Sequence, residues 1–122
     1  KIILTNNAPK AVGPYSQAIE ANGTLYVSGQ LPVNPTDGSV PESIEAQTEQ
    51  SLKNIGAILT EAGYTYKDVV KSTVLLTDMN DFAAMNAVYA RFYTEQMPAR
   101  VCYQVAKLPM GVKVEIETVA VK

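Results

Sequence analysis

One long segment near the middle of the chain, residues 44–62, carries its apolar side chains at helical spacing and constrains the fold more than any other feature. Its apolar stripe consists of Ile44, Leu52, Ile55, Leu59 and Ala62. Ser43 can serve as the N-cap, and Gly63 suits the position that follows the last helical residue. The pattern predicts an amphipathic helix that buries one face.

The rest of the chain alternates strand-like and helix-like segments between loops rich in Pro and Gly. Strands are predicted over Ile2–Thr5, Ser16–Glu20, Thr24–Leu31, Val69–Leu76, Pro98–Ala106 and Val112–Glu117. A second helix is predicted to begin at Asp78, Asn80 or Asp81 and to bury Phe82, Met85, Tyr89 and Phe92. The order β-β-β-α-β-α-β-β predicts an α+β fold with one mixed sheet and both helices on one face. The opposite face would stay apolar in a monomer, which argues for an oligomer.

Three details of the strands give expectations of their own. In the third strand, Leu25 and Gln30 are expected on opposite faces, and Gly29 is typical of a bulge or a close backbone approach. The β-branched run Val69–Leu76 is expected to be buried on both faces. The apolar positions change phase after Thr118, which indicates a bulge or a strand covered on both sides.

Composition excludes several classes of function. The 122 residues suit one domain spanning residues 1–122, and a net charge of −2 disfavours nucleic-acid binding. Without histidine and with Cys102 alone, the chain cannot form an internal disulfide, a usual zinc site or a His-based catalytic triad. We therefore expect no metal site. No apolar run is long enough to span a membrane, so we expect no membrane association and a cytoplasmic location.

The last quarter of the chain offers the best chemistry. Alternation places Arg100 and Cys102 on one strand face, and it places Glu115 and Glu117 together on a face of the final strand. We expect these two strands, joined by the short Pro/Gly turn Lys107–Gly111, to be neighbours. An arginine and a carboxylate held there could bind a small anionic substrate and activate a water beside it.

Each candidate also has a structural interpretation. Arg100 suits an inter-subunit ion pair equally well, and Cys102 suits a small buried residue better than a nucleophile. Asn86 is expected on the solvated face of the second helix, and Tyr15 as a packed surface aromatic. A glutamate in a strand is usually exposed to solvent. Two glutamates beside a strand that carries an arginine favour the interpretation that one of them lines the same pocket.

Several motifs together resemble the RidA (YjgF/YER057c/UK114) family over residues 7–122. They are Gly13-Pro14-Tyr15-Ser16-Gln17, Ser28-Gly29-Gln30, Asn80-Asp81-Phe82, Pro98-Ala99-Arg100, Val105-Ala106-Lys107-Leu108-Pro109 and Val114-Glu115-Ile116-Glu117. The resemblance implies a chorismate-mutase-like fold and a homotrimer with three sites between subunits. It also implies hydrolysis of small 2-imino acids and their enamines to 2-keto acids and ammonia, with no cofactor.

The resemblance also implies roles for single residues. Arg100 would bind the substrate carboxylate, and Glu115 would position or activate the attacking water. Tyr15, Gly29, Asn86 and Cys102 would line the cleft. The alternative is a binding or regulatory member of the same family, acting as a translation inhibitor, ribonuclease or chaperone.

Overall fold

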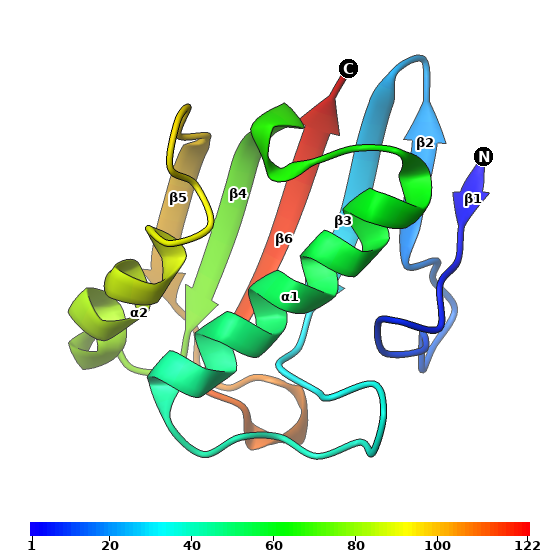
Figure 1. Ribbon diagram of the computed structural model, residues 1–122. Helices are drawn as coiled ribbons and strands as arrows, with labels where there is room; N and C mark the ends of the chain where they lie inside the picture. Colours follow the sequence, from blue (N-terminus) through cyan, green and yellow to red (C-terminus); the bar gives the residue numbers. More distant parts are fainter.

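Six strands form one mixed sheet in the order β1-β2-β3-β6-β4-β5, in a computed structural model that describes residues 1–122 (Figure 1). The strands are β1 (Ile2–Ile3), β2 (Ala18–Ala21), β3 (Thr24–Gln30), β4 (Val69–Leu76), β5 (Ala99–Gln104) and β6 (Val114–Val121). Only β4 and β5 run parallel, and the other four pairs are antiparallel. The predicted order of elements and the mixed sheet are both confirmed.

Two helices cover one face of this sheet (Figure 1). The long helix, α1 (Ile44–Ala62), has the predicted bounds. The Ser43 hydroxyl accepts a hydrogen bond from the Ala46 amide at 3.0 Å, and Gly63 takes the left-handed conformation (φ 83°) that suits glycine after a helix. The shorter helix, α2 (Phe82–Tyr89), forms the crossover between β4 and β5. Neither helix has the length and continuous hydrophobicity needed to cross a membrane.

The second helix ends earlier than its apolar pattern suggests. Met85 and Tyr89 are buried as predicted, but Phe82 is 36% exposed and Phe92 lies beyond the end of the helix. Asp78 caps the short 3₁₀ turn before α2, where its carboxylate accepts a hydrogen bond from the backbone of the second residue along. Further 3₁₀ turns lie at Tyr66–Asp68 and Pro109–Gly111.

The face of the sheet away from the helices is uncovered within one chain. Strand β4 is buried on the helix side only, so the expectation that both of its faces are buried is wrong for the single chain. The uncovered face carries large apolar side chains that are between 38% and 53% exposed: Ile19, Tyr26, Val101, Tyr103 and Val121. The apolar second face predicted from the sequence is therefore present.

A bulge in β3 changes which side chains face the core. The register with β6 shifts between Val27 and Gln30, as Gly29 suggested, so Gln30 turns inward and is only 5% exposed. The placement of Gln30 opposite to Leu25 is therefore wrong. In strand β6, buried and exposed side chains alternate without interruption past Thr118, so β6 itself has no bulge there. The irregularities lie in its neighbours β3 and β4.

Polar side chains of α1 hold the segment that follows this bulge. Ser51 donates a hydrogen bond to the Gln30 carbonyl at 2.8 Å, and Asn54 donates to the carbonyls of Leu31 and Val33 at 3.0 and 2.9 Å. These bonds satisfy buried backbone groups that the sheet leaves without partners. They fix the backbone around Gly29 relative to the core.

The two terminal strands are not neighbours. Strand β4 lies between β5 and β6 and pairs with both, through Ser72 to Arg100 on one side and Thr118 on the other. The expectation of adjacent strands is wrong because the Pro/Gly turn joins an edge strand to a central one. This arrangement decides how the candidate residues meet.

Candidate active site

Arg100 lies on edge strand β5 and faces α2. Its Nη1 donates a hydrogen bond to Asn86 Oδ1 at 2.8 Å and approaches Met85 Sδ at 4.0 Å. The centre of its guanidinium lies 4.9 Å from the ring of Tyr89 and 5.6 Å from that of Phe82. None of the ion pairs within the chain involves Arg100. A partly buried cation without a carboxylate partner is suited to binding an anion from outside the chain.

A cavity of about 290 Å³ opens beside this guanidinium. Its lining includes Asn86, Tyr89, Met97, Pro98 and Arg100. The expectation that Asn86 lies on a solvated face is therefore wrong. Asn86 lies one turn after Phe82 on the helix face that contacts Arg100, so it becomes a partner of the arginine. We call Arg100, Asn86 and this cavity the anchor half of the site.

Cys102 lies two residues after Arg100 on the same face of β5 and is half-buried. Burial raises the pKa of its thiol, and the nearby charge of Arg100 opposes that rise. A thiol with a raised pKa is a poor nucleophile at neutral pH. Its side chain packs against the hydrophobic core and is not among those that line the cavity beside Arg100, as its interpretation as a small buried residue suggested.

Glu115 lies on the uncovered face of the sheet, directly against Gly29. A Cβ atom added to Gly29 would overlap Glu115 Oε2 and lie 2.9 Å from its Cδ, so glycine is required for this approach. Burial raises the pKa of Glu115, and the negative charge of Glu117 on the same strand face raises it further. A half-buried carboxylate with a raised pKa is suited to accept a proton from water.

Tyr15 and Gly29 line a cavity of about 330 Å³ together with Val12, Leu31 and Met110. The Tyr15 side chain is 48% exposed, and its hydroxyl accepts a hydrogen bond from the Val12 amide at 3.4 Å. Gly29 connects this cavity to Glu115, so we call Tyr15, Gly29 and Glu115 the base half of the site.

The two halves do not meet within one chain. Arg100 shares the helix-facing side with its register partner Ser72, whereas Glu115 pairs with Leu75, whose side chain points to the uncovered face. Alternation along a strand sends neighbouring side chains to opposite faces, so this separation follows from the register alone. A site that uses both groups needs a second copy of the chain.

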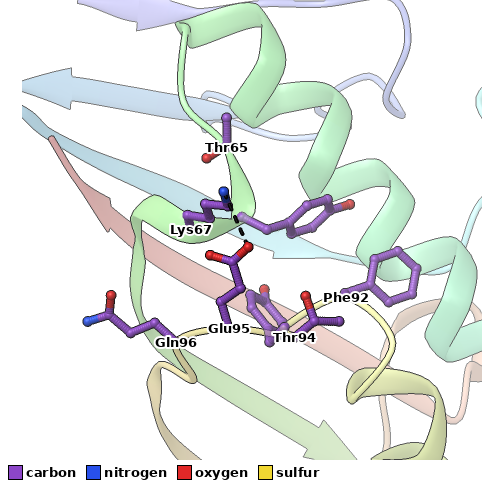
Figure 2. Close-up of a pocket in the computed structure, with 8 residues that line it drawn as sticks. Thr65, Lys67, Phe92, Thr94, Glu95 and Gln96 are labelled. Atoms are coloured by element: carbon purple, nitrogen blue, oxygen red, sulfur yellow. Dashed lines mark ion pairs between the residues drawn. The ribbon is translucent and has the colours of Figure 1, made fainter.

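A further cavity, of about 300 Å³ (Figure 2), is lined by none of the predicted site residues and shares only Tyr93 with the cavity beside Arg100. Lys67 Nζ and Glu95 Oε1 form an ion pair at 3.4 Å beside it, and both side chains are about two-thirds exposed. Thr65, Thr94 and Gln96 are its other polar side chains. With its charges paired and exposed, this cavity offers no reagent to a bound molecule.

Sequence reasoning missed the aromatic contacts of the anchor. Phe82 and Tyr89 were interpreted only as core residues of the second helix. Their spacing from Asn86, four residues before and three after, was the signal that these side chains share one helix face. No group of three or more possible ligand side chains is arranged to hold a metal ion.

Comparison with known proteins identifies the family. The family model described as Endoribonuclease L-PSP (Ribonuc_L-PSP) matches residues 5–122. The chain belongs to this family. The resemblance to RidA proteins predicted from the motifs is thereby confirmed.

Relatives in the Ribonuc_L-PSP family are similar over the whole chain. The 2-iminobutanoate/2-iminopropanoate deaminase of Escherichia coli K12 is 50% identical over 125 residues, which cover 100% of this chain and 98% of that protein. The mouse (Mus musculus) protein of the same name is 49% identical over 123 residues, covering 100% and 91%. The crystal structure of E. coli TdcF with bound serine superimposes with a TM-score of 0.98 at 45% identity, covering 100% and 98%.

Proposed function

We propose that this chain is a hydrolytic deaminase that converts 2-iminopropanoate, 2-iminobutanoate and their enamine tautomers into 2-keto acids and ammonia. Relatives at about 50% identity over the full length are named for this activity. The observation that carries the proposal is the unpaired Arg100 guanidinium beside a small cavity, with Asn86 holding it at 2.8 Å. A 2-imino acid presents the carboxylate that such a guanidinium binds.

The complete site lies between two subunits. The anchor half of one chain faces the base half of the next, so Arg100 and Glu115 of different chains act on one substrate. Apolar side chains on the uncovered face support such an interface, because an exposed apolar face is costly in water. We propose a closed homotrimer with three such sites, formed from chains in which residues 1–122 make one RidA-like domain with a chorismate-mutase-like fold.

The reaction follows from these two groups. Arg100 holds the substrate carboxylate and so fixes the C=N bond relative to a water molecule at Glu115. Glu115 takes a proton from this water as its oxygen bonds to the imine carbon, and the proton passes to nitrogen. The resulting carbinolamine loses ammonia and leaves the C=O bond of the 2-keto acid. Water is the only co-reactant, so the reaction requires no cofactor.

The remaining lining residues have supporting roles. Asn86 orients the guanidinium. Cys102 flanks the cleft on the side of Arg100, and Tyr15 flanks it on the side of Glu115. Gly29 provides the space that Glu115 occupies. An imine carbon is already electrophilic, so orientation and one base, the latter worth about 10²–10⁴-fold, are sufficient for useful acceleration.

The test is the Arg100→Ala variant, assayed with 2-iminobutanoate generated in situ and with ammonia release as the readout. We expect kcat/KM to fall by about a hundredfold or more, since charge-assisted hydrogen bonds to the substrate are lost. Arg91→Ala is the matched control, because Arg91 is an exposed arginine that pairs with Glu49 at 3.7 Å and does not line the cavity. Full activity in Arg100→Ala with an intact assembly would overturn the proposal.

The family description names a second activity, cleavage of RNA. A net charge of −2 gives little general attraction for phosphates, so we rank this function below deamination. Cleavage of a defined RNA by the wild-type chain that persists in Arg100→Ala after repeated purification would reverse that order.

A further inference from the structure

Four buried hydroxyl groups gather beneath the anchor half of the site. Ser72 Oγ, Tyr89 Oη, Tyr93 Oη and Thr118 Oγ1 are all buried and have no hydrogen-bond partner with good geometry. Ser72 and Thr118 are cross-strand partners, and the rings of Tyr89 and Tyr93 lie 4.7 Å apart. The Tyr89 hydroxyl lies beside Ser72, and the Tyr93 hydroxyl lies beside Ser72 and Thr118, so the four groups are one another's nearest polar neighbours.

Tyr89 connects this cluster to Arg100. Its ring lies 4.9 Å from the centre of the guanidinium, while its hydroxyl end lies near Ser72, which is the register partner of Arg100 on β4. Phe82 contributes a second ring at 5.6 Å. The ring of Tyr89 therefore contacts the Arg100 guanidinium, while its hydroxyl lies in the core.

The guanidinium needs such support. Within the chain, Asn86 is its one oxygen partner, and no carboxylate holds it. A single hydrogen bond leaves a long side chain free to rotate about the bond, whereas a ring face restrains the plane of the guanidinium. Two-point binding of a carboxylate requires that this plane be fixed.

We propose that Tyr89 is a positioning residue, whose ring holds the Arg100 guanidinium in the orientation that binds the substrate carboxylate. Phe82 assists from its own ring. The proposal rests on the proposed function of Arg100 and goes beyond it by explaining why an aromatic ring lies beside the guanidinium at this point. It concerns binding rather than the chemical step, because the carboxylate is held equally in the substrate and in the transition state.

The test compares Tyr89→Leu, which removes the ring, with Tyr89→Phe, which keeps it. We expect Tyr89→Leu to raise KM for 2-iminobutanoate by about fivefold to thirtyfold, the range of a cation–π contact, with kcat nearly unchanged. Tyr89→Phe should restore KM toward the wild-type value. Calorimetric binding of 2-oxobutanoate, the stable product, should weaken in Tyr89→Leu by a similar factor.

Phe92→Leu is the matched control. Phe92 belongs to the same aromatic group, with its ring 5.5 Å from that of Tyr66, but it makes no contact with Arg100. This variant should lower the melting temperature without raising KM. If Tyr89→Leu fails to fold, Phe82→Leu decides, since the 36% exposed Phe82 is less important to the core and should raise KM in the same direction.

The possible outcomes separate this inference from the proposed function. Suppose that the wild type is active and Arg100→Ala is inactive. An unchanged KM in Tyr89→Leu would then overturn the role of Tyr89 alone. A fall in kcat of Tyr89→Leu without a rise in KM would have the same meaning. If Tyr89→Leu is unfolded, unchanged KM in Phe82→Leu has the same meaning. A wild-type chain that neither hydrolyses 2-iminobutanoate nor binds 2-oxobutanoate would overturn both proposals.

Discussion

Mixing two inactive variants of this chain should restore activity. In Arg100→Ala the anchor half is lost and the base half is intact, and in Glu115→Gln the reverse holds. The two residues lie on opposite faces of the sheet, so each complete site of the proposed assembly would take its arginine from one chain and its glutamate from another. A mixed assembly therefore contains some sites in which both groups are wild type.

The size of the recovery follows from this geometry. In an equal and random mixture, each site has a one-half chance of an intact Arg100 and an independent one-half chance of an intact Glu115 from the next chain. About a quarter of the sites should be complete, whatever the number of subunits in the closed ring. Activity should then reach about a quarter of the wild-type value, against a background of roughly a hundredth or less for either variant alone.

The assay is ammonia release from 2-iminobutanoate after the two chains are co-expressed or refolded together. Separately folded chains that are combined without exchange serve as the control and should stay inactive. A mixture that shows only the background of the single variants, with mixed assemblies demonstrated by mass spectrometry, would refute the shared site. Both groups would then act within one chain, which contradicts the register of β4 with its two neighbours.

Three further predictions concern the base half of the site. Burial and Glu117 raise the pKa of Glu115, so its active carboxylate form should be lost as the pH falls through that raised pKa. Glu117→Gln should lower the pKa of Glu115 and move the acidic limb of the kcat/KM profile to lower pH. An acidic limb that does not move would contradict the coupling between the two carboxylates. The same raised pKa means that the charged carboxylate destabilises the folded chain above this pKa, so Glu115→Gln should raise the free energy of unfolding at neutral pH, and the gain should vanish below about pH 4. Gly29→Ala should displace the Glu115 carboxylate, because the added Cβ would overlap it, and lower kcat by about a hundredfold while binding of 2-oxobutanoate at Arg100 is retained. Unchanged kcat in Gly29→Ala would show that the carboxylate moves without consequence.

The sequence was sufficient for the long helix α1 and the order of elements because those features depend on local physics. Ser43 and Gly63 marked the bounds of α1 through capping and backbone freedom, which act within a few residues. The dipeptide Asn22-Gly23, which is typical of a two-residue hairpin turn and has positive φ at both residues (51° and 76°), likewise determines the pairing of β2 with β3. None of these features depends on where the rest of the chain goes.

The strand neighbours could not be predicted in the same way. Adjacent strands in the sequence, β5 and β6, are separated in space by β4, because a parallel crossover through α2 places β5 at the edge. The inward turn of Gln30 depends on a bulge whose exact register only β6 determines. Pairing between distant segments decides both features, and local sequence patterns carry little information about it.

The sequence alone determined which groups are available to this protein: a strand arginine and a pair of glutamates, without histidine and with a single cysteine. It also gave the motifs that identified the family. Only the tertiary structure decided that Arg100 and Glu115 lie on opposite faces of one sheet and that Phe82 and Tyr89 enclose the guanidinium. The reason is physical: side-chain chemistry belongs to single residues, whereas the face on which a residue lies depends on the register of strands that are far apart in the chain.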